Sequence, residues 1–350
     1  MTAVGEVRLP ELDGARCVHA AIETASCQAC VEVCPKKAWH LDDAALEFDA
    51  GLCDGCGLCV PACPRQAIVL PLSFASRPVA GTTATLAACD RVAGHVPSCS
   101  ESGYIPCLHA IGLGDLLRAY RSGQHLWLLA HGDCADCPRG CGESLFNKVS
   151  HLNRALRQRG RPFIVLREVS MSVWTSLLKS SAGQGQAQAR RGFFRALSQR
   201  PAAMLLGENS LPEEERKPPG EFLPGGDDAL MPWVVQLEAT RCVGCHACVR
   251  VCPEGAIRFV ETFSRDDVPA FHLHPRACTG CGLCLDVCAH QAVRLQPWAE
   301  PTQTTLPLIE QRCRRCGVDF YLPVDVFDGV RECWICGGAK HSNRMYQVMK

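Results

Sequence analysis

The feature that most constrains this chain is a run of cysteines in the segment RCVGCHACVRVCPEGAI, residues 241–257. Its four cysteines are Cys242, Cys245, Cys248 and Cys252. Two residues separate each of the first three, three residues precede the fourth, and a proline follows. The two-residue steps let a tight turn direct three thiolates at one iron–sulfur cube, whereas the longer step turns the fourth toward another cube. The run therefore predicts a pair of [4Fe-4S] clusters.

A second run supplies the remaining ligands, Cys278, Cys281, Cys284 and Cys288. The crossed arrangement assigns one cluster to Cys242, Cys245, Cys248 and Cys288 and the other to Cys278, Cys281, Cys284 and Cys252. Paired zinc knuckles are the alternative, but zinc takes four ligands and does not need two interlocked runs of four. Residues 236–300 thus resemble the two-cluster bacterial ferredoxin domain.

The beginning of the chain carries a related pattern. A complete run contains Cys53, Cys56, Cys59 and Cys63, and an incomplete run ahead of it contains Cys27, Cys30 and Cys34. Thr24 stands where the first cysteine of that incomplete run is expected. However, R-C-V at 16–18 matches R-C-V at 241–243, with seven extra residues before the next cysteine. This alignment makes Cys17 the displaced ligand.

Residues 10–75 are therefore predicted to form another dicluster domain. One [4Fe-4S] cluster is assigned to Cys17, Cys27, Cys30 and Cys63, and the other to Cys53, Cys56, Cys59 and Cys34. The alternative is a three-iron cluster, with Cys17 an ordinary buried thiol. All four runs end alike, in CPKKAWHL, CPRQAIVL, CPEGAIRF and CAHQAVRL, which indicates an internal repeat of a half-domain.

Residues 80–170 read as a small α/β domain. Short apolar strands are expected at 84–89, 104–108, 125–132 and 162–168, and helical spacing of apolar residues occurs at 112–121 and 142–159. Strands that alternate with helices indicate a mostly parallel sheet. In such a sheet, sites gather beyond the carboxyl ends of the strands.

Several cysteines of this domain follow its expected strands, so that their loops could converge on one metal centre. An iron–sulfur centre is predicted, with Cys107, Cys134, Cys137 and Cys141 as first choices and Cys89 in reserve. The alternatives are a structural zinc or a redox dithiol. The stretch IPCLHAIGLGDLLRAYRSG, AHGDCADCPRGCGESL and IVLRE resembles the small iron–sulfur subunit of methyl-viologen-reducing hydrogenases. That resemblance implies one [2Fe-2S] cluster and electron exchange with hydrogenase, although Cys137 and Cys141 depart from the family's pattern.

The remaining segments are a linker and a C-terminal metal module. Residues 171–235 are expected to be a linker, low in complexity at 180–192 and rich in proline and acidic residues at 208–228. At 306–350, two CxxCG knuckles contain Cys313, Cys316, Cys333 and Cys336. Their spacing resembles a zinc ribbon, with a single rubredoxin-like iron as the alternative. The expected fold class is therefore α+β and multidomain: two ferredoxin-like domains flanking a small α/β domain, with a C-terminal zinc ribbon.

Composition narrows the function. The 26 cysteines fall in metal-ligand clusters rather than in the framework of a short secreted chain, the first residues lack a secretory signal pattern, and no apolar run reaches the roughly 20 residues of a membrane span. A cytoplasmic location follows as an expectation, because thiolates stay reduced there. The formal net charge of zero argues against nucleic acid as a partner.

No substrate-transforming motif is visible. The sequence lacks a dinucleotide-binding GxGxxG after a strand, a P-loop, a GxSxG elbow and the CxxxCxxC run of radical enzymes. A row of redox centres remains, and we expect an electron-transfer subunit of an oxidoreductase complex, with redox proteins as partners. The alternative is a ferredoxin-like accessory protein that assembles or regulates a metalloenzyme. A reductase whose middle centre contacts substrate is a third hypothesis.

Overall fold

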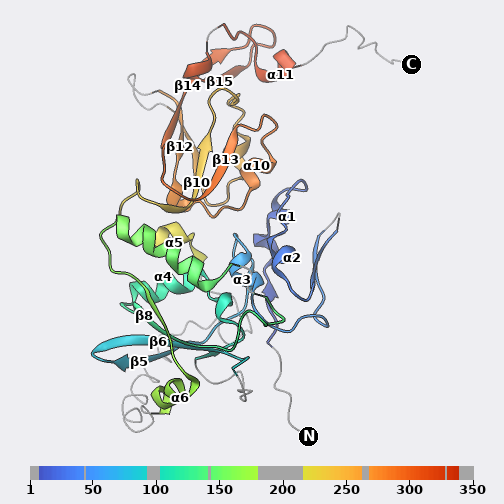
Figure 1. Ribbon diagram of the computed structural model, residues 1–350. Helices are drawn as coiled ribbons and strands as arrows, with labels where there is room; N and C mark the ends of the chain where they lie inside the picture. The colour runs from blue at the N-terminus through green and yellow to red at the C-terminus, as the bar shows by residue number, and fades with distance from the viewer. Residues whose placement is uncertain are drawn as a thin grey trace, which may run out of the picture. The chain divides into compact units, whose positions relative to one another are not determined.

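The computed structural model describes residues 8–42, 45–92, 103–140, 143–179, 216–261, 268–327 and 329–338. Helices and strands are mixed throughout, and the chain divides into two compact units (Figure 1). The N-terminal unit ends at Leu230, and the C-terminal unit begins at Met231. Among the described residues, no helix combines the length and the apolar character that crossing a membrane requires.

The N-terminal unit opens with short elements that bracket its cysteine runs. They are β1 (Glu11–Leu12), the 3₁₀ turn η1 (Gly14–Arg16), α1 (Val18–Ala21), α2 (Ala29–Val33), β2 (Trp39–Leu41), β3 (Leu46–Phe48), α3 (Cys59–Ala62) and β4 (Ile68–Val69). β1 pairs with β4 and β2 pairs with β3, both antiparallel. A small core forms between the helices and strands, where Trp39 and Ile68 are almost fully buried. The residues inserted after Cys17 form α1 and the loop behind it.

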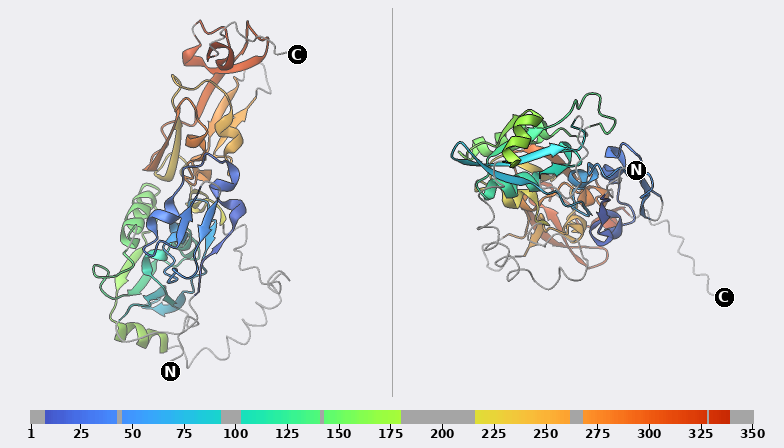
Figure 2. Two further views of the ribbon diagram at one scale, coloured as in Figure 1. Left: turned by 90° about the vertical axis from the view of Figure 1, so that its right-hand side faces the viewer. Right: turned by 90° about the horizontal axis from the view of Figure 1, so that it is seen from below.

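A five-stranded sheet follows, lying beside the first elements in both views of Figure 2. The elements of this α/β layer are β5 (Ala75–Val79), β6 (Thr82–Cys89), β7 (Tyr104–Ile105), η2 (Leu108–Ala110), α4 (Leu113–Arg121), β8 (Leu126–Ala130), α5 (Leu145–Gln158) and β9 (Val165–Glu168). The strand order is β5-β6-β8-β9, and β7 also pairs with β6. Only β5 is antiparallel to its neighbour, because it joins β6 through a tight hairpin.

Helices cover both faces of this sheet. Figure 1 shows α4 and α5 on one face and α6 (Met171–Lys179) on the other. Trp174 anchors α6, since its fully buried indole packs on β6 and β8 and meets the ring of Tyr104 edge-on. The structure thus has a packed helix where the sequence indicated linker, because one large apolar side chain completes the core beneath the sheet. The interior of the expected linker, residues 180–215, lies outside the described residues.

The end of that stretch also packs on the N-terminal unit. Arg216 is nearly buried and pairs with Asp13 at 2.7 Å, and α8 (Pro219–Phe222) lies against α4. Arg159, just after α5, donates hydrogen bonds to the carbonyl oxygens of Gly225 and Leu230. Residues 216–230 are therefore fastened to the α/β layer by specific polar contacts.

The C-terminal unit repeats the architecture of the first segment. Its elements are β10 (Met231–Leu237), α9 (Ala247–Val251), β11 (Ile257–Val260), β12 (Ala270–Leu273), η5 (Pro275–Ala277), α10 (Leu283–Asp286), β13 (Val293–Ala299), β14 (Thr305–Arg312), β15 (Asp319–Pro323), η6 (Val324–Val326) and α11 (Trp334–Gly338). β10 pairs with β13 as β1 pairs with β4, and β11 pairs with β12 as β2 pairs with β3.

The last segment is joined to this domain through its sheet. β14 adds to the free edge of β12, and β15 adds to β14, which gives a four-stranded sheet in the order β11-β12-β14-β15. The backbone of Tyr321 on β15 lies so close to Gly244 that a side chain at Gly244 would overlap it. The knuckle segment is thus built onto the loop that carries the first cysteines of the domain.

Candidate metal centres

The displaced cysteine of the first segment joins its expected partners. One cavity, open at the surface, is lined by four thiols, those of Cys17, Cys27, Cys30 and Cys63. Burial, together with the neighbouring Cys63, Cys27 and Cys17, raises the pKa of Cys30 to about 12. Thiols held this way stay uncharged at neutral pH unless a positive group compensates them, so the cavity fits a metal cluster. The ligand assignment itself remains a prediction.

The other predicted set of this segment also gathers. The four cysteines Cys34, Cys53, Cys56 and Cys59 act on one another electrostatically. Burial, as the largest effect, raises the pKa values of both Cys56 and Cys59 to about 12. Cys34 reaches this set from the first run, as the crossed arrangement requires.

Two cavities of the C-terminal unit are lined by cysteines in the same crossed arrangement. One is lined by Cys242, Cys245, Cys248 and Cys288, and the other by Cys252, Cys278, Cys281 and Cys284. Burial raises the pKa of Cys248 to about 12 and that of Cys278 to about 12. Each cavity thus draws three thiols from one run and one from the other.

A repeated turn explains why each run ends in the same letters. After the last cysteine, a residue with positive φ turns the chain, and the next residue, a buried alanine, donates its backbone N–H to the cysteine sulfur. The four bonds, at 3.2–3.3 Å, run from Ala38 to Cys34, Ala67 to Cys63, Ala256 to Cys252 and Ala292 to Cys288. Such N–H donors stabilise a thiolate. Ala289, which replaces the usual proline, leaves this turn intact.

The middle domain brings its cysteines to one cavity at the carboxyl ends of its parallel strands. The four cysteines that line it are Cys89, Cys107, Cys134 and Cys137. Cys89 ends β6, Cys107 follows β7, and the other two follow β8. Burial raises the pKa of Cys107 to about 11, and Cys89 and Cys137 add to the effect. Cys89, expected only in reserve, therefore lies at the centre of the set, while Cys141 lies outside the described residues.

A histidine with one unpaired ring nitrogen also lines this cavity. His109 lines the cavity and is 5% exposed. Its Nδ1 accepts the backbone N–H of Leu145 at 3.0 Å, so the hydrogen of the neutral ring lies on Nε2, which finds no partner among the described residues. Burial lowers the pKa of His109 and keeps the ring neutral. A sulfur-containing group in the cavity would supply the missing acceptor. His131 also lines the cavity; its Nδ1 hydrogen-bonds the carbonyl oxygen of Gly132, and its Nε2 likewise finds no hydrogen-bond partner among the described residues.

Sequence reasoning missed a buried charge that lines the middle cavity. Arg139 is 5% exposed and lines the middle cavity, and its guanidinium pairs with Asp54 and Asp90. Both aspartates directly follow a cysteine, in the dipeptides Cys53-Asp54 and Cys89-Asp90. The Cys-Asp dipeptide can be recognised in the sequence. Its pairing with Arg139 could not be predicted, because the aspartates lie 85 and 49 residues away from the arginine.

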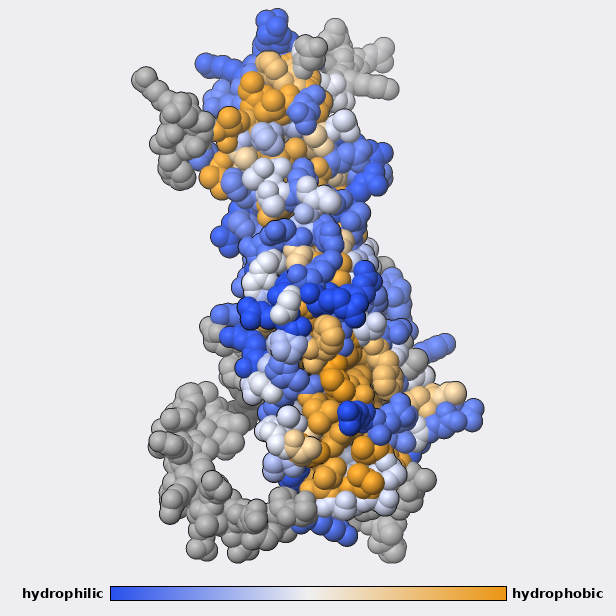
Figure 3. Space-filling model, turned by 60° about the vertical axis from the view of Figure 1, so that its left-hand side comes forward, coloured by the Kyte–Doolittle hydropathy of each residue, from blue (hydrophilic) through white to orange (hydrophobic). Residues whose placement is uncertain are grey.

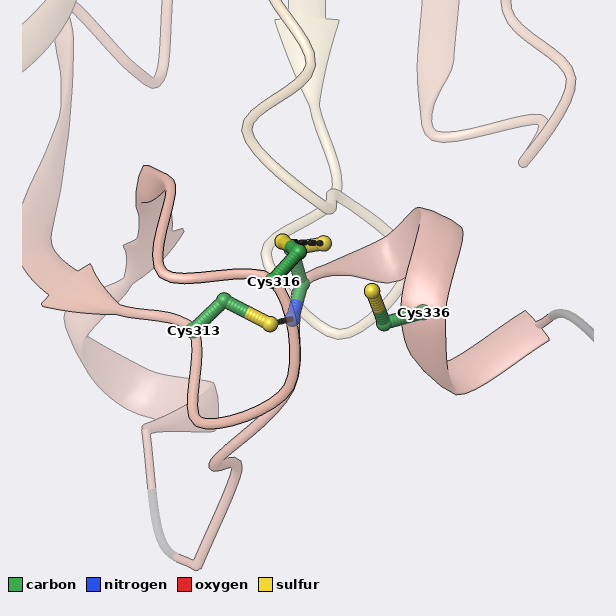
Figure 4. Close-up of side chains that lie close together, drawn as sticks. Cys313, Cys316 and Cys336 are labelled. Carbon is green, nitrogen blue, oxygen red and sulfur yellow. Dashed lines mark hydrogen bonds between the residues drawn. The ribbon is translucent and has the colours of Figure 1, made fainter.

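The two C-terminal knuckles form a centre of a different kind. The sulfur atoms of Cys313, Cys316, Cys333 and Cys336 all lie within 4.8 Å of one another. Among the described residues, no other set of three or more candidate ligands converges so closely. Figure 4 shows three of the knuckle sulfurs turned toward a common point. A zinc–sulfur bond of about 2.3 Å gives a tetrahedral edge of about 3.8 Å, so this set fits a single metal ion.

Hydrogen bonds prepare one knuckle thiol for that ion. The backbone N–H groups of Cys316 and Cys333 lower the pKa of Cys313 to about 6, the latter at 3.3 Å from its sulfur. Cys336 has the opposite environment, in which burial and the neighbouring sulfurs raise its pKa to about 12. Without a cation the group would hold mixed thiol and thiolate, whereas a metal ion would make all four thiolates.

Comparison with known proteins supports the cluster interpretation. Residues 25–68 and residues 241–292 each match a model of the 4Fe-4S dicluster domain. The chain is also 27% identical over 118 residues to an uncharacterized ferredoxin of Methanocaldococcus jannaschii. That stretch covers 34% of this chain and 63% of the relative, so the chain spans less than two thirds of the relative's length.

The chain therefore contains two 4Fe-4S dicluster domains of the ferredoxin type, which confirms this part of the sequence-based interpretation. These domain matches support iron–sulfur binding and a role in electron transfer. The first matched segment begins at residue 25, after Cys17, so the assignment of Cys17 as a ligand stays a prediction.

Proposed function

We propose that this chain relays electrons between a catalytic oxidoreductase subunit and a redox partner within a cytoplasmic complex. The observation that carries the proposal is the set of four cysteine quartets in two dicluster domains, each gathered around a largely buried site. When bound, a [4Fe-4S] cluster exchanges one electron at a time with little rearrangement. The chain's own residues hold the thiolates, exclude water from them and donate N–H groups to sulfur.

A fifth centre in the middle domain would extend the relay. We assign it to Cys89, Cys107, Cys134 and Cys137, and we favour an iron–sulfur cluster because acceptor sulfurs would satisfy the buried Nε2–H of His109. The resemblance of this region to the small hydrogenase subunit supports a hydrogen-metabolising or related enzyme as the catalytic partner.

The C-terminal knuckles serve a structural role in this proposal. We assign zinc to them because four closely converged sulfurs form a closed site with no open position.

Trp334 and Ile335 lie next to the metal ligands and are 44% and 61% exposed. Figure 3 shows exposed apolar side chains on this part of the molecule. An apolar surface held rigid by a metal ion suits the docking of a protein partner.

Anaerobic reconstitution tests the relay. The full chain should bind iron and inorganic sulfide in amounts that account for four [4Fe-4S] clusters and a middle centre, with one zinc. Its clusters should be reduced chemically and reoxidised by an added electron acceptor. Zinc without iron, or clusters that no acceptor reoxidises, would contradict the proposal, and labile clusters lost on transfer to an immature enzyme would favour the accessory role.

A matched pair of variants identifies the middle ligands. Cys89→Ser should remove the iron of the middle centre and its electron paramagnetic resonance signal, because Cys89 lines the cavity and is 8% exposed. Cys141→Ser tests the other expected ligand in the same way. Iron kept in Cys89→Ser would exclude Cys89, and iron lost in Cys141→Ser would make Cys141 a ligand of the centre.

A further inference from the structure

Arg139 reaches three loops that are distant in sequence. Its Nε donates to Asp54 Oδ2 at 2.9 Å, and its Nη1 donates to Asp90 Oδ1 at 2.8 Å and to the carbonyl oxygen of Pro106 at 2.6 Å. Its Nη2 donates to the carbonyl oxygen of Asp54 at 3.3 Å. The guanidinium thus binds both the side chain and the backbone of Asp54.

Each of these partners adjoins a cysteine of a proposed centre. Asp54 follows Cys53 of the first dicluster domain, whereas Asp90 follows Cys89 and Pro106 precedes Cys107 of the middle set. Arg139 itself lies two residues after Cys137. One cation therefore holds the ligand loops of two centres in a fixed relation.

The two centres also touch through apolar atoms. A single buried cluster is formed by Cys56, Leu58, Cys107 and Ala110. At Gly57, a methyl group would lie 3.2 Å from the Cβ of Ala110, so the two backbones are in close contact. A ligand of the dicluster domain and a ligand of the middle set thus belong to one packed apolar cluster.

The charge of Arg139 is permanent. Burial alone would lower its pKa, but the hydrogen bonds that it donates to Asp54 and Asp90 outweigh burial and hold the pKa above its ordinary value. Burial raises the pKa values of Cys53, Cys56 and Cys107, Asp54 adds to this at Cys53 and Cys56, and the guanidinium opposes the rise at all three thiols. In a site largely shielded from water, this positive charge acts on both sets of sulfurs.

We propose that Arg139 is a positioning residue shared by the middle centre and the Cys34/Cys53/Cys56/Cys59 centre, and that it sets the reduction potentials of both so that electrons pass directly between them. This inference rests on the proposed function. In each transfer one centre is oxidised by one electron and the other is reduced by one electron, and the arginine keeps its proton throughout.

The test is a redox titration of the anaerobically reconstituted full chain, followed by electron paramagnetic resonance. Arg139→Gln should shift the potentials of both centres downward, because a negative charge added on reduction is no longer compensated. Arg139→Lys keeps the charge and should shift them less. Asp54→Asn removes a negative charge beside Cys53 and should shift the dicluster centre upward, a sign that general destabilisation would not produce.

Arg159→Gln is the matched control, because Arg159 also bridges backbone carbonyl oxygens that are distant in the sequence, those of Gly225, Gly226 and Leu230. The centres of the C-terminal unit serve as an internal reference and should not move. The shared role would be overturned if Arg139→Gln kept its full iron content and left both potentials unchanged, or if it shifted the potential of one centre only. An equal shift in Arg159→Gln would overturn it as well. A wild-type chain without iron in the middle set would instead contradict the proposed function. If Arg139→Gln fails to fold, Arg139→Lys and Asp54→Asn decide the question.

Discussion

At the scale of single residues, two glycines of one cysteine run allow the cost of steric crowding to be distinguished from the cost of a left-handed backbone. Gly280 and Gly282 both have positive φ, at 74° and 82°. A Cβ at Gly280 would overlap the indole ring of Trp233, whereas a Cβ at Gly282 would meet nothing within 4 Å. Both positions lie between ligands of the same predicted cluster.

Gly282→Ala should therefore cost only the left-handed backbone, about 1 kcal/mol of unfolding free energy. Gly280→Ala should cost that amount and about 1–3 kcal/mol more, because Trp233 must move. Denaturant unfolding of the reconstituted protein, followed by the loss of cluster absorbance, measures both. Equal losses in the two variants would show that Trp233 yields freely and that the close packing is unimportant.

What the sequence could reveal at this scale depended on local spacing. Cys17 was predicted because its neighbours repeat those of Cys242, and the recurring alanines marked a turn, whose N–H donation to sulfur only the structure shows. Arg139 could not be found this way. Its partners come from β6 and from another domain, and only the folded chain brings them together.

At the scale of elements, the knuckle segment should lose its metal in acid. Backbone N–H groups lower the pKa of Cys313 to about 6, against an ordinary value of 9.0. The contribution of this thiolate to metal binding is complete above the ordinary value and is lost as the pH falls through about 6, since ligands must be deprotonated. Chelator competition from about pH 8 to about pH 5 should show release of the metal near the lower end.

Cys313→Ser is the matched variant for that titration. It should release the metal throughout the range, because serine is a poor zinc ligand at these pH values. The dicluster domain beneath it should keep its iron in both proteins, since β14 and β15 add to the sheet without supplying cluster ligands. Metal retained by wild type well below pH 5 would contradict a dependence on the Cys313 thiolate.

The elements themselves were predicted unevenly. Strands and helices of the middle domain fall where apolar spacing indicated, because a parallel sheet with covering helices leaves a clear periodic pattern. The addition of β14 to β12 gave no such signal, since backbone pairing between distant strands is not encoded in any local motif. Helix α6 was missed although Met171, Trp174 and Leu178 lie at helical spacing and pack on the sheet, because this short apolar stretch adjoins the low-complexity segment and was included in the linker.

At the scale of the whole molecule, the division at Leu230 predicts two fragments that hold iron separately. Leu230 belongs to the N-terminal unit, because its N–H is donated to Gln158 at 2.7 Å and its carbonyl oxygen accepts from Arg159. Met231 begins β10, which pairs with β13 within the C-terminal unit. No predicted cluster draws ligands from both sides of this division.

Residues 1–230 and residues 231–350, produced as separate chains, should therefore each bind about eight iron atoms in a dicluster domain. The N-terminal fragment should also hold the middle centre, and the C-terminal fragment should hold the knuckle metal. Iron and sulfide analysis after anaerobic reconstitution checks this. As the control, a division at residue 50 separates Cys34 from Cys53 and should abolish both clusters of the first domain, because each takes ligands from both runs. Clusters of the first domain retained after that second division would contradict the crossed assignment, whereas iron lost after the division at Leu230 would show that the two units depend on each other.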